Sequence, residues 1–192
     1  MINTENFEFE RIYHIFSHVN GKEVIFREDS NYYYFLEKLS KYIIPIADIY
    51  AYCMMPNHFH LLLRFKSFEE IRAENEHQYL MKTFSNLLNS YAKAFNKVYH
   101  RKGALFLNTI KRKKVNDDKY LLKALHYIHN NPVNHGFVNK ITDWKYSSYN
   151  SYLSNDKESK LDRETILEYF ETLDDFIAYH YSNVEYDYLN LE

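Results

Sequence analysis

Residues 46–65 read IADIYAYCMMPNHFHLLLRF, and this stretch decides the fold that we expect. On either side of Pro56 and Asn57 the residues are mostly β-branched, aromatic or aliphatic, which is typical of strands. A proline followed by an asparagine is typical of a turn. The stretch therefore predicts a β-hairpin whose second strand contains His58 and His60.

The segments around this hairpin predict the remaining elements from their hydrophobic spacing and turn residues. They are a strand at residues 11–19, a turn at Asn20 and Gly21, a helix at residues 31–43 capped by Asp29 or Ser30, a helix at residues 76–99, a strand at residues 108–115, and a helix from Asp117 or Asp118 to near Pro132. The order β-α-β-β-α-β-α predicts an α+β fold with a mostly antiparallel sheet covered by helices.

The composition indicates a folded protein of one main domain. The chain has 192 residues, 46% of them hydrophobic, with 20 Tyr and 14 Phe, which is enough to form a sizeable core. We expect residues 1–153 to form this domain and residues 154–192 to form an acidic extension, with a helix at residues 162–173. Cys53 is the only cysteine, and no targeting or membrane segment is recognisable, so we expect a soluble, cytoplasmic protein.

The net charge of −2 hides an uneven distribution of charge. Residues 155–192 carry 11 acidic and 3 basic side chains, so the rest of the chain is net positive. Residues 91–115 contain eight Lys or Arg and no Asp or Glu. Such a segment is a candidate surface for a polyanion, although a solvated helix face followed by a lysine-rich strand edge has the same composition.

His58 and His60 are the first candidates for chemistry. Side chains alternate between the faces of a strand, so His58, His60, Leu62 and Arg64 share one side. Two imidazoles on one face, about 7 Å apart along the strand, are able to share a divalent ion if a third ligand comes from elsewhere. From the spacing alone, hydrogen-bonded strand histidines without any metal are the favoured explanation.

Tyr127 and Asn131 are the second candidates. They lie one turn apart on the flank of the helix that precedes Pro132, about 100° from its apolar stripe. A phenol ordinarily has a pKa of about 10 and attacks phosphate poorly unless a cation lies nearby. From spacing alone, Tyr127 is therefore either a packing residue or a nucleophile. The neighbouring His126, His129 and His135 are candidates for bases or phosphate contacts, although surface histidines are the favoured interpretation.

Five segments, taken together and in order, resemble the single-tyrosine HUH transposases of insertion sequences, and most closely the REP-associated tyrosine transposase-like proteins. They are YHIFSHVNG (residues 13–21), AYCMMPNHFHLLLRF (residues 51–65), NSYAKAFNKVYHRKGALF (residues 89–106), YLLKALHYIHNNPVNHGFV (residues 120–138) and DWKYSSY (residues 143–149). The combination of MPNHFHLL with YIHNNPV is specific to this resemblance.

The resemblance implies a ferredoxin-like fold and a role for each matching residue. His58 and His60 match the histidine pair that binds a divalent cation, Mg²⁺ or Mn²⁺. Tyr127 matches the nucleophile, and Asn131 matches the polar residue one turn later that supplies a third metal ligand. Asn130 stands beside it, and the turn spacing favours Asn131.

The activity implied by the resemblance is metal-dependent cleavage and rejoining of single-stranded DNA, as in DNA transposition. The partner would be single-stranded DNA with hairpin or palindromic elements, and relatives include both homodimers and monomers. Two alternatives are a hairpin-binding module that does not cut DNA and a metal-dependent hydrolase that uses bound water. The basic residues that we expect to contact the phosphate backbone are Arg101, Lys102, Lys111, Arg112, Lys113 and Lys114.

Overall fold

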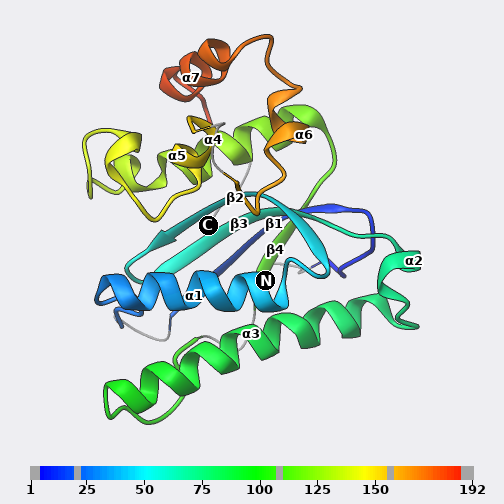
Figure 1. Cartoon of the computed structure of the whole chain (residues 1–192), viewed down its shortest axis with the longest axis vertical. Helices are drawn as coiled ribbons and strands as arrows, with labels where there is room; N and C mark the ends of the chain where they lie inside the picture. Colours follow the sequence, from blue (N-terminus) through cyan, green and yellow to red (C-terminus); the bar gives the residue numbers. More distant parts are fainter. Residues whose placement is uncertain (1–4, 20–22, 107–109, 155–157, 187–192) are drawn as a thin grey trace.

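A four-stranded antiparallel sheet forms the centre of the molecule (Figure 1). The computed structural model describes residues 5–19, 23–106, 110–154 and 158–186. The strands lie in the order β2-β3-β1-β4, and each neighbouring pair is antiparallel. Their bounds are β1 (Ile12–His18), β2 (Ala47–Met55), β3 (His58–Phe65) and β4 (Lys111–Val115).

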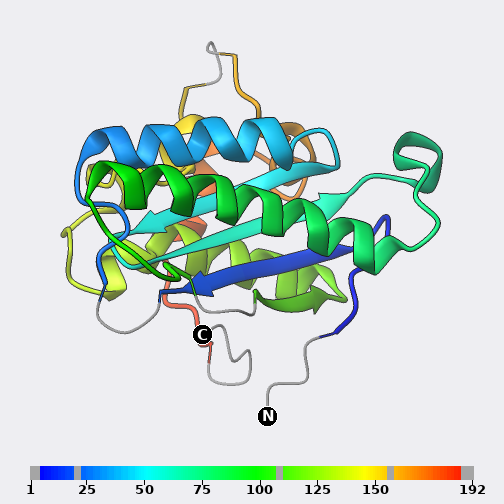
Figure 2. The same cartoon turned by 90° about the horizontal axis from the view of Figure 1, so that it is seen from below.

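Helices cover both faces of the sheet. On one face α1 (Asp29–Tyr42) and α3 (Glu76–Val98) run beside each other (Figure 2). The opposite face is covered mainly by α4 (Asp118–Asn134), with the later helices beyond it (Figure 1). The remaining helices are α2 (Phe68–Ile71), the 3-10 helix η1 (Ile141–Asp143), α5 (Tyr149–Tyr152), α6 (Arg163–Leu167) and α7 (Leu173–Tyr181). The α+β class is confirmed, and the predicted strands and helices occur in the predicted order, with the short helix α2 between β3 and α3 as an addition.

The alternation of β3 divides the interior into two cores. Phe59, Leu61 and Leu63 pack in the core beneath α1 and α3, whereas Leu62 packs in the core beneath α4. The predicted hairpin also forms, because Met55 of β2 pairs with His58 of β3 across the two-residue turn. The odd and even positions of β3 therefore face different helices, as the period of two requires.

Helix ends differ from the expectations because capping groups, rather than proline, set them. Pro132 lies inside α4, which continues to Asn134 and is followed by Gly136 with φ of 70°. A glycine with positive φ just beyond a helix is a common stop signal. At the start of α1 the cap is Glu28 rather than Asp29 or Ser30, because the Asn31 Oδ1 accepts the Glu28 N–H at 3.3 Å.

The acidic extension contains two short helices where one was expected at residues 162–173. Asp162 caps α6, and Thr172 caps α7 with its side chain accepting the N–H of Asp175. The second cap starts a new helix and breaks the predicted one. Parts of two expectations, the turn at residues 20 and 21 and the start of the strand at residues 108–115, lie outside the described residues.

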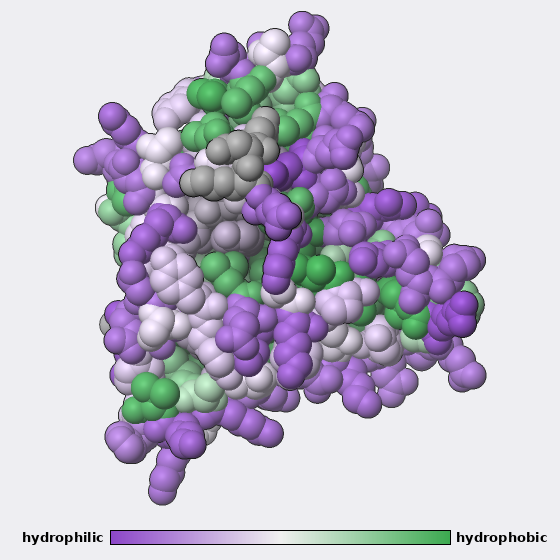
Figure 3. All heavy atoms as spheres, in the orientation of Figure 1, coloured by the Kyte–Doolittle hydropathy of each residue, from purple (hydrophilic) through white to green (hydrophobic). Residues whose placement is uncertain are grey.

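The face of the molecule in Figure 3 is mostly hydrophilic, with apolar residues gathered in small patches. Scattered exposed apolar residues of this kind are normal for a folded domain. Within the part of the chain that the structure describes, no helix is both long enough and apolar enough to cross a membrane.

Candidate active site

The two histidines of β3 lie on the face of the sheet that α4 covers. His58 is 6% exposed and His60 is fully buried, and their ring centroids are 5.1 Å apart with the planes nearly perpendicular. β3 is flanked by β2 and β1, so its backbone is hydrogen-bonded on both sides. The two imidazoles are therefore carried by a rigid central strand.

Helix α4 brings Tyr127 and Asn131 onto these histidines. The Tyr127 ring lies 5.4 Å from the His60 ring, edge to face, and the Asn131 Oδ1 lies 3.2 Å from the His58 Nε2. Leu121, Leu125 and Ile128 are buried as the helical spacing predicts, which orients the flank of α4 toward β3. All four predicted residues thus meet within one chain, without a contribution from a second copy.

The neighbouring amides of α4 point in different directions. The Asn130 Nδ2 donates to the carbonyls of His126, at 3.2 Å, and of His180, at 3.1 Å. The Asn131 side chain is fully buried, and its Nδ2 has no hydrogen-bond partner among the described residues. Asn131 therefore faces His58, as the turn spacing led us to expect, whereas Asn130 joins α4 to α7.

The His58, His60 and Asn131 side chains fit a small divalent ion. The His58 Nε2 and the Asn131 Oδ1 form a hydrogen bond of 3.2 Å. Two atoms that bind Mg²⁺ at right angles, each about 2.1 Å from it, have a similar separation of about 3 Å, so an ion is able to replace this hydrogen bond without moving the two side chains far. Imidazole nitrogens suit transition metals, and an amide oxygen suits Mg²⁺ and Mn²⁺. The described residues contain no cluster of three or more His, Cys, Asp or Glu able to hold a metal ion, so any site here depends on the amide.

His14 of β1 is a buried neighbour of this group that the sequence motifs did not single out. Its Nε2 lies 2.9 Å from the His60 Nδ1, and its ring centroid is 6.1 Å from that of Tyr127. Burial lowers the pKa of His14 to about 3, with a smaller effect from the charge of Lys113, so its ring is neutral near pH 7. The alternation of the strand at residues 11–19 was the available signal, but it does not tell which strand lies alongside.

Of the three histidines near Tyr127 and Asn131 in the sequence, only His135, which directly follows α4, is a surface residue. His126 and His129 are buried, and burial lowers the pKa of His126 to about 4 and that of His129 well below its usual value. His129 contacts His180 of α7 and Ser148, whereas the exposed His135 lies with its ring centroid 5.6 Å from that of His58. Of the three, only His135 is placed to meet a ligand at the β3 histidines.

The end of the described chain reaches the candidate nucleophile. The Tyr186 ring lies 5.3 Å from the Tyr127 ring, edge to face, and its hydroxyl is hydrogen-bonded to the His126 Nδ1. The Lys123 Nζ donates to the carbonyl of Glu185 at 2.8 Å. The acidic extension is thus packed along α4, and Tyr127 is only 7% exposed.

The six basic residues of the predicted DNA surface do not share one environment. Arg112 is 5% exposed, packs its guanidinium over the Phe7 ring and donates to the carbonyl of Ile110, so burial excludes it as a phosphate contact. Arg101 and Lys114 form ion pairs with Glu23, at 2.9 Å, and Glu8, at 2.8 Å. These pairs compete with phosphate for the two cations.

Lys111 and Lys113 are on the face of β4 that the histidines occupy. Lys113 pairs with His14 and Lys111 pairs with Phe16 in the register of β1 and β4, and the Lys111 Nζ lies 5.6 Å from the Phe16 ring centroid. Because paired residues project to the same side of a sheet, both lysines flank the group around His60. Lys102, by contrast, lies exposed in the loop after α3.

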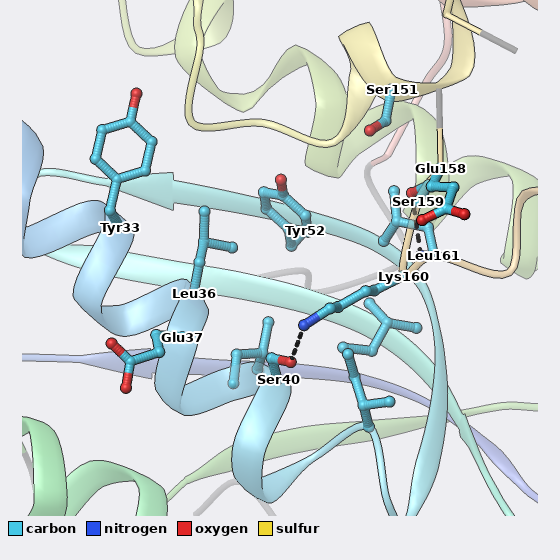
Figure 4. Close-up of a pocket in the computed structure, with 13 residues that line it drawn as sticks. Tyr33, Leu36, Glu37, Ser40, Tyr52, Ser151, Glu158, Ser159, Lys160 and Leu161 are labelled. Atoms are coloured by element: carbon cyan, nitrogen blue, oxygen red, sulfur yellow. Dashed lines mark hydrogen bonds between the residues drawn. The ribbon is translucent and has the colours of Figure 1, made fainter. Parts of the chain in front are cut away.

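A pocket of about 440 Å³ lies elsewhere, beside β2 (Figure 4). It is lined by Tyr33 and Leu36 of α1, by Tyr52 of β2 and by residues 158–161. The Lys160 Nζ lies 2.7 Å from the Ser40 Oγ, as Figure 4 shows. None of the predicted site residues lines this pocket, so it is separate from the candidate active site.

Comparison with known proteins supports the resemblance. No family model matches the chain. Over 101 residues, which are 52% of this chain, it is 34% identical to a protein of Haemophilus influenzae provisionally named a REP-associated tyrosine transposase. The match spans 57% of that protein's length.

The fold is similar to that of a solved structure of a REP-associated tyrosine transposase bound to a REP hairpin. The TM-score is 0.59 at 15% identity, and the match covers 83% of this chain and 90% of the other. At this identity the likeness concerns the fold alone. The resemblance seen in the sequence motifs is thus supported: the chain is similar to a REP-associated tyrosine transposase in sequence over 52% of its length, and to another in fold over 83% of its length.

Proposed function

We propose that this protein cleaves and rejoins single-stranded DNA through a covalent 5′-phosphotyrosine intermediate on Tyr127, as in DNA transposition. The observation that carries the proposal is the meeting of a tyrosine, two histidines and an amide on one buried face: the Tyr127 ring lies 5.4 Å from the His60 ring, and the Asn131 Oδ1 lies 3.2 Å from the His58 Nε2. A hairpin-binding module would not need this set, because binding alone requires no nucleophile.

His58, His60 and Asn131 are the residues that would hold the ion. Mg²⁺ or Mn²⁺ bound there supplies a Lewis acid that polarises the scissile phosphate and stabilises its developing charge. The amide and the two imidazoles lie on β3 and α4, which are packed together, so the donor atoms are preorganised. Tyr127, on the same flank of α4 as Asn131, is thereby held next to the ion site.

Tyr127 acts as the nucleophile in the proposed reaction. Its Oη loses its proton to solvent and forms a bond to phosphorus, the bond from phosphorus to the 3′ oxygen breaks, and the leaving 3′ oxygen takes up a proton from solvent. One DNA strand leaves with a free 3′-hydroxyl, and the other stays attached through its 5′ phosphate. Another 3′-hydroxyl then attacks the phosphotyrosine and restores Tyr127, which joins two strands without ATP.

Single-stranded DNA with hairpin elements is the proposed partner. The solved relative is bound to a REP hairpin, and a matching ligand here would place its phosphates near the sheet face of His58 and His60. Lys111 and Lys113 flank that face, and Lys102 lies exposed in the loop after α3. These three residues, rather than Arg112, are our choice for backbone contacts.

We also assign the ferredoxin-like arrangement and the domain division within this proposal. The strand order β2-β3-β1-β4, with α1 and α3 on one face, supports the arrangement. We take residues 1–153 as the catalytic domain and residues 154–192 as the extension packed along α4.

The deciding experiment incubates a labelled hairpin-containing single strand with the protein and Mn²⁺ or Mg²⁺. We expect a protein-linked label that survives denaturing electrophoresis, and Tyr127→Phe should abolish it. Tyr120→Phe is the matched control, since Tyr120 lies on the same helix and its hydroxyl has no hydrogen-bond partner among the described residues. An adduct that persists in Tyr127→Phe would contradict the assignment, and cleavage without an adduct would favour the hydrolase.

A further inference from the structure

His14 forms a buried contact with one of the two proposed metal-binding histidines. Its Nε2 lies 2.9 Å from the His60 Nδ1, and the two rings stack with centroids 5.1 Å apart and planes inclined by 22°. His14 projects from β1, the strand next to β3, and Phe16 is the residue directly paired with His60. His14 therefore reaches His60 diagonally across the two strands.

The contact between these two nitrogens holds one proton. A hydrogen bond between two neutral imidazoles needs one N–H and one bare nitrogen. Since the His60 Nδ1 is engaged with His14, a bond from His60 to an ion would come from its Nε2, which must then be free of a proton. That condition is met only when the proton lies on the His60 Nδ1 and the His14 Nε2 accepts it.

The opposite arrangement would block the ion site. If the His14 Nε2 donated, the His60 Nδ1 would be bare and the proton of the neutral ring would lie on the Nε2. The other nitrogen of His14, Nδ1, has no hydrogen-bond partner among the described residues in either arrangement. The direction of the hydrogen bond between His14 and His60 therefore decides which nitrogen of His60 carries the proton.

We propose that His14 is a positioning residue that accepts the Nδ1 proton of His60 and so presents the His60 Nε2 to the divalent ion. The inference rests on the proposed function, because it assumes that His60 is a metal ligand. Metal-binding histidines are commonly oriented through the second ring nitrogen in this way, usually by a carboxylate or a carbonyl. Here a neutral histidine occupies that place, held by its stacking on His60 and, at 5.1 Å, on Phe16.

The test compares His14→Phe with His14→Gln by titrating Mn²⁺ in a calorimeter. Phenylalanine keeps the ring and its packing but cannot accept a proton, so we expect it to weaken Mn²⁺ binding about 10- to 100-fold. The glutamine Oε1 can take the place of the His14 Nε2, so His14→Gln should stay within a few fold of the wild type. His77→Phe, which removes a histidine of α3, controls for the loss of a nonspecific site.

Imidazole ¹⁵N chemical shifts of the wild-type protein with Mg²⁺ report which nitrogen of His60 carries the proton, and this measurement does not depend on a variant that folds. We expect the His60 proton on Nδ1, and finding it on Nε2 would overturn the proposal. Unchanged Mn²⁺ affinity in His14→Phe would overturn it too.

The outcome for His14 is distinguishable from that for the proposed function. Adduct formation by the wild type, together with unchanged affinity in His14→Phe, would remove only the role of His14. Mn²⁺ binding that depends on His14, without any adduct, would remove only the proposed reaction. A wild type that binds no Mn²⁺ would overturn both.

Discussion

At the scale of single residues, the candidate site contains polar groups that burial makes costly. Asn131 is fully buried, and its Nδ2 has no hydrogen-bond partner among the described residues. An unsatisfied buried donor costs about 1–3 kcal/mol of folding free energy. The Nδ2 of its neighbour Asn130, by contrast, donates to two carbonyls, of His126 in α4 and of His180 in α7. Residues kept at such a cost are frequently functional.

The two amides should separate metal binding from stability. Asn131→Leu removes the unsatisfied donor and the proposed ligand, so we expect weaker Mn²⁺ binding and a change of less than about 1 kcal/mol in the free energy of unfolding. Asn130→Ala removes hydrogen bonds that join α4 to α7, so it should lower that free energy by about 1 kcal/mol and leave Mn²⁺ binding intact. Urea denaturation and calorimetry measure the two quantities, and the reverse pattern would contradict the choice of Asn131.

At the scale of elements, β4 distributes its charges between two faces of the sheet. Lys111 and Lys113 share the face of His14, whereas Arg112 and Lys114 share the face that packs near Phe7 and Glu8. Burial lowers the pKa of Lys113 somewhat, which indicates that its ammonium group is partly withdrawn from water. A basic run that looks uniform in sequence thus becomes two surfaces with different partners.

Lys113→Gln and Lys114→Gln form a matched pair for this division. If DNA lies along the α4 side of the sheet, Lys113→Gln should weaken binding of a hairpin-containing single strand. The slope of log affinity against log salt should fall by about 0.7, the value for one phosphate contact on a single strand. Lys114→Gln should leave the slope unchanged. Fluorescence anisotropy over a range of salt concentrations measures this, and equal effects of the two substitutions would place the DNA elsewhere.

At the scale of the whole molecule, a buried chain of hydrogen bonds joins the C-terminal extension to the sheet. The His180 Nδ1 donates to the carbonyl of Phe176, so its Nε2 accepts from the His129 Nδ1, both at 2.8 Å. The His129 Nε2 then accepts from the Ser148 Oγ at 2.8 Å. The Ser148 Oγ also accepts the N–H of Tyr52 on β2 and lies 3.2 Å from the Tyr52 carbonyl, a second acceptor for its proton. Burial keeps the His129 and His180 rings neutral near pH 7, and the contacts hold α4 between the sheet and α7.

These hydrogen-bonded, buried histidines predict that the protein loses stability in acid. Burial lowers the pKa of His180 to about 3 and that of His129 well below its usual value, whereas both titrate near 6.5 in the unfolded chain. Below about pH 6.5 only the unfolded state takes up these protons, so the free energy of unfolding should fall as pH falls. The slope is about 1.4 kcal/mol per pH unit for each histidine.

His180→Gln removes one of these titrating groups and keeps an oxygen that can accept from His129. Between pH 6 and pH 5 we expect the free energy of unfolding of the variant to depend less steeply on pH than that of the wild type. The difference in slope should correspond to the uptake of about one proton fewer on unfolding. Urea denaturation at several pH values measures the slope. An identical slope in the variant would show that His180 is protonated in the folded protein as well.

The local pattern of the sequence was sufficient for most elements, and the family resemblance was needed to single out the four proposed active-site residues. Alternation in β3 and the apolar spacing of α4 depend only on backbone geometry, so they predicted which residues share a face. The sequence predicted the ends of α1 and α4 and the break in the extension less well. Alternative capping positions differ by little in free energy, so the local pattern did not single out Glu28, Gly136 and Thr172.

What the sequence by itself determined was the α+β class, the placement of His58 and His60 on one face of a strand, and the set of motifs that resembles the REP-associated tyrosine transposases. Only the tertiary structure decided which cations are accessible, which amide faces the histidines, and that His14 contacts His60. The physical reason is the separation along the sequence over which each effect acts. Alternation and helical spacing act between residues a few positions apart, whereas strand register and the docking of α4 join groups that are 46 and 73 positions apart in the chain.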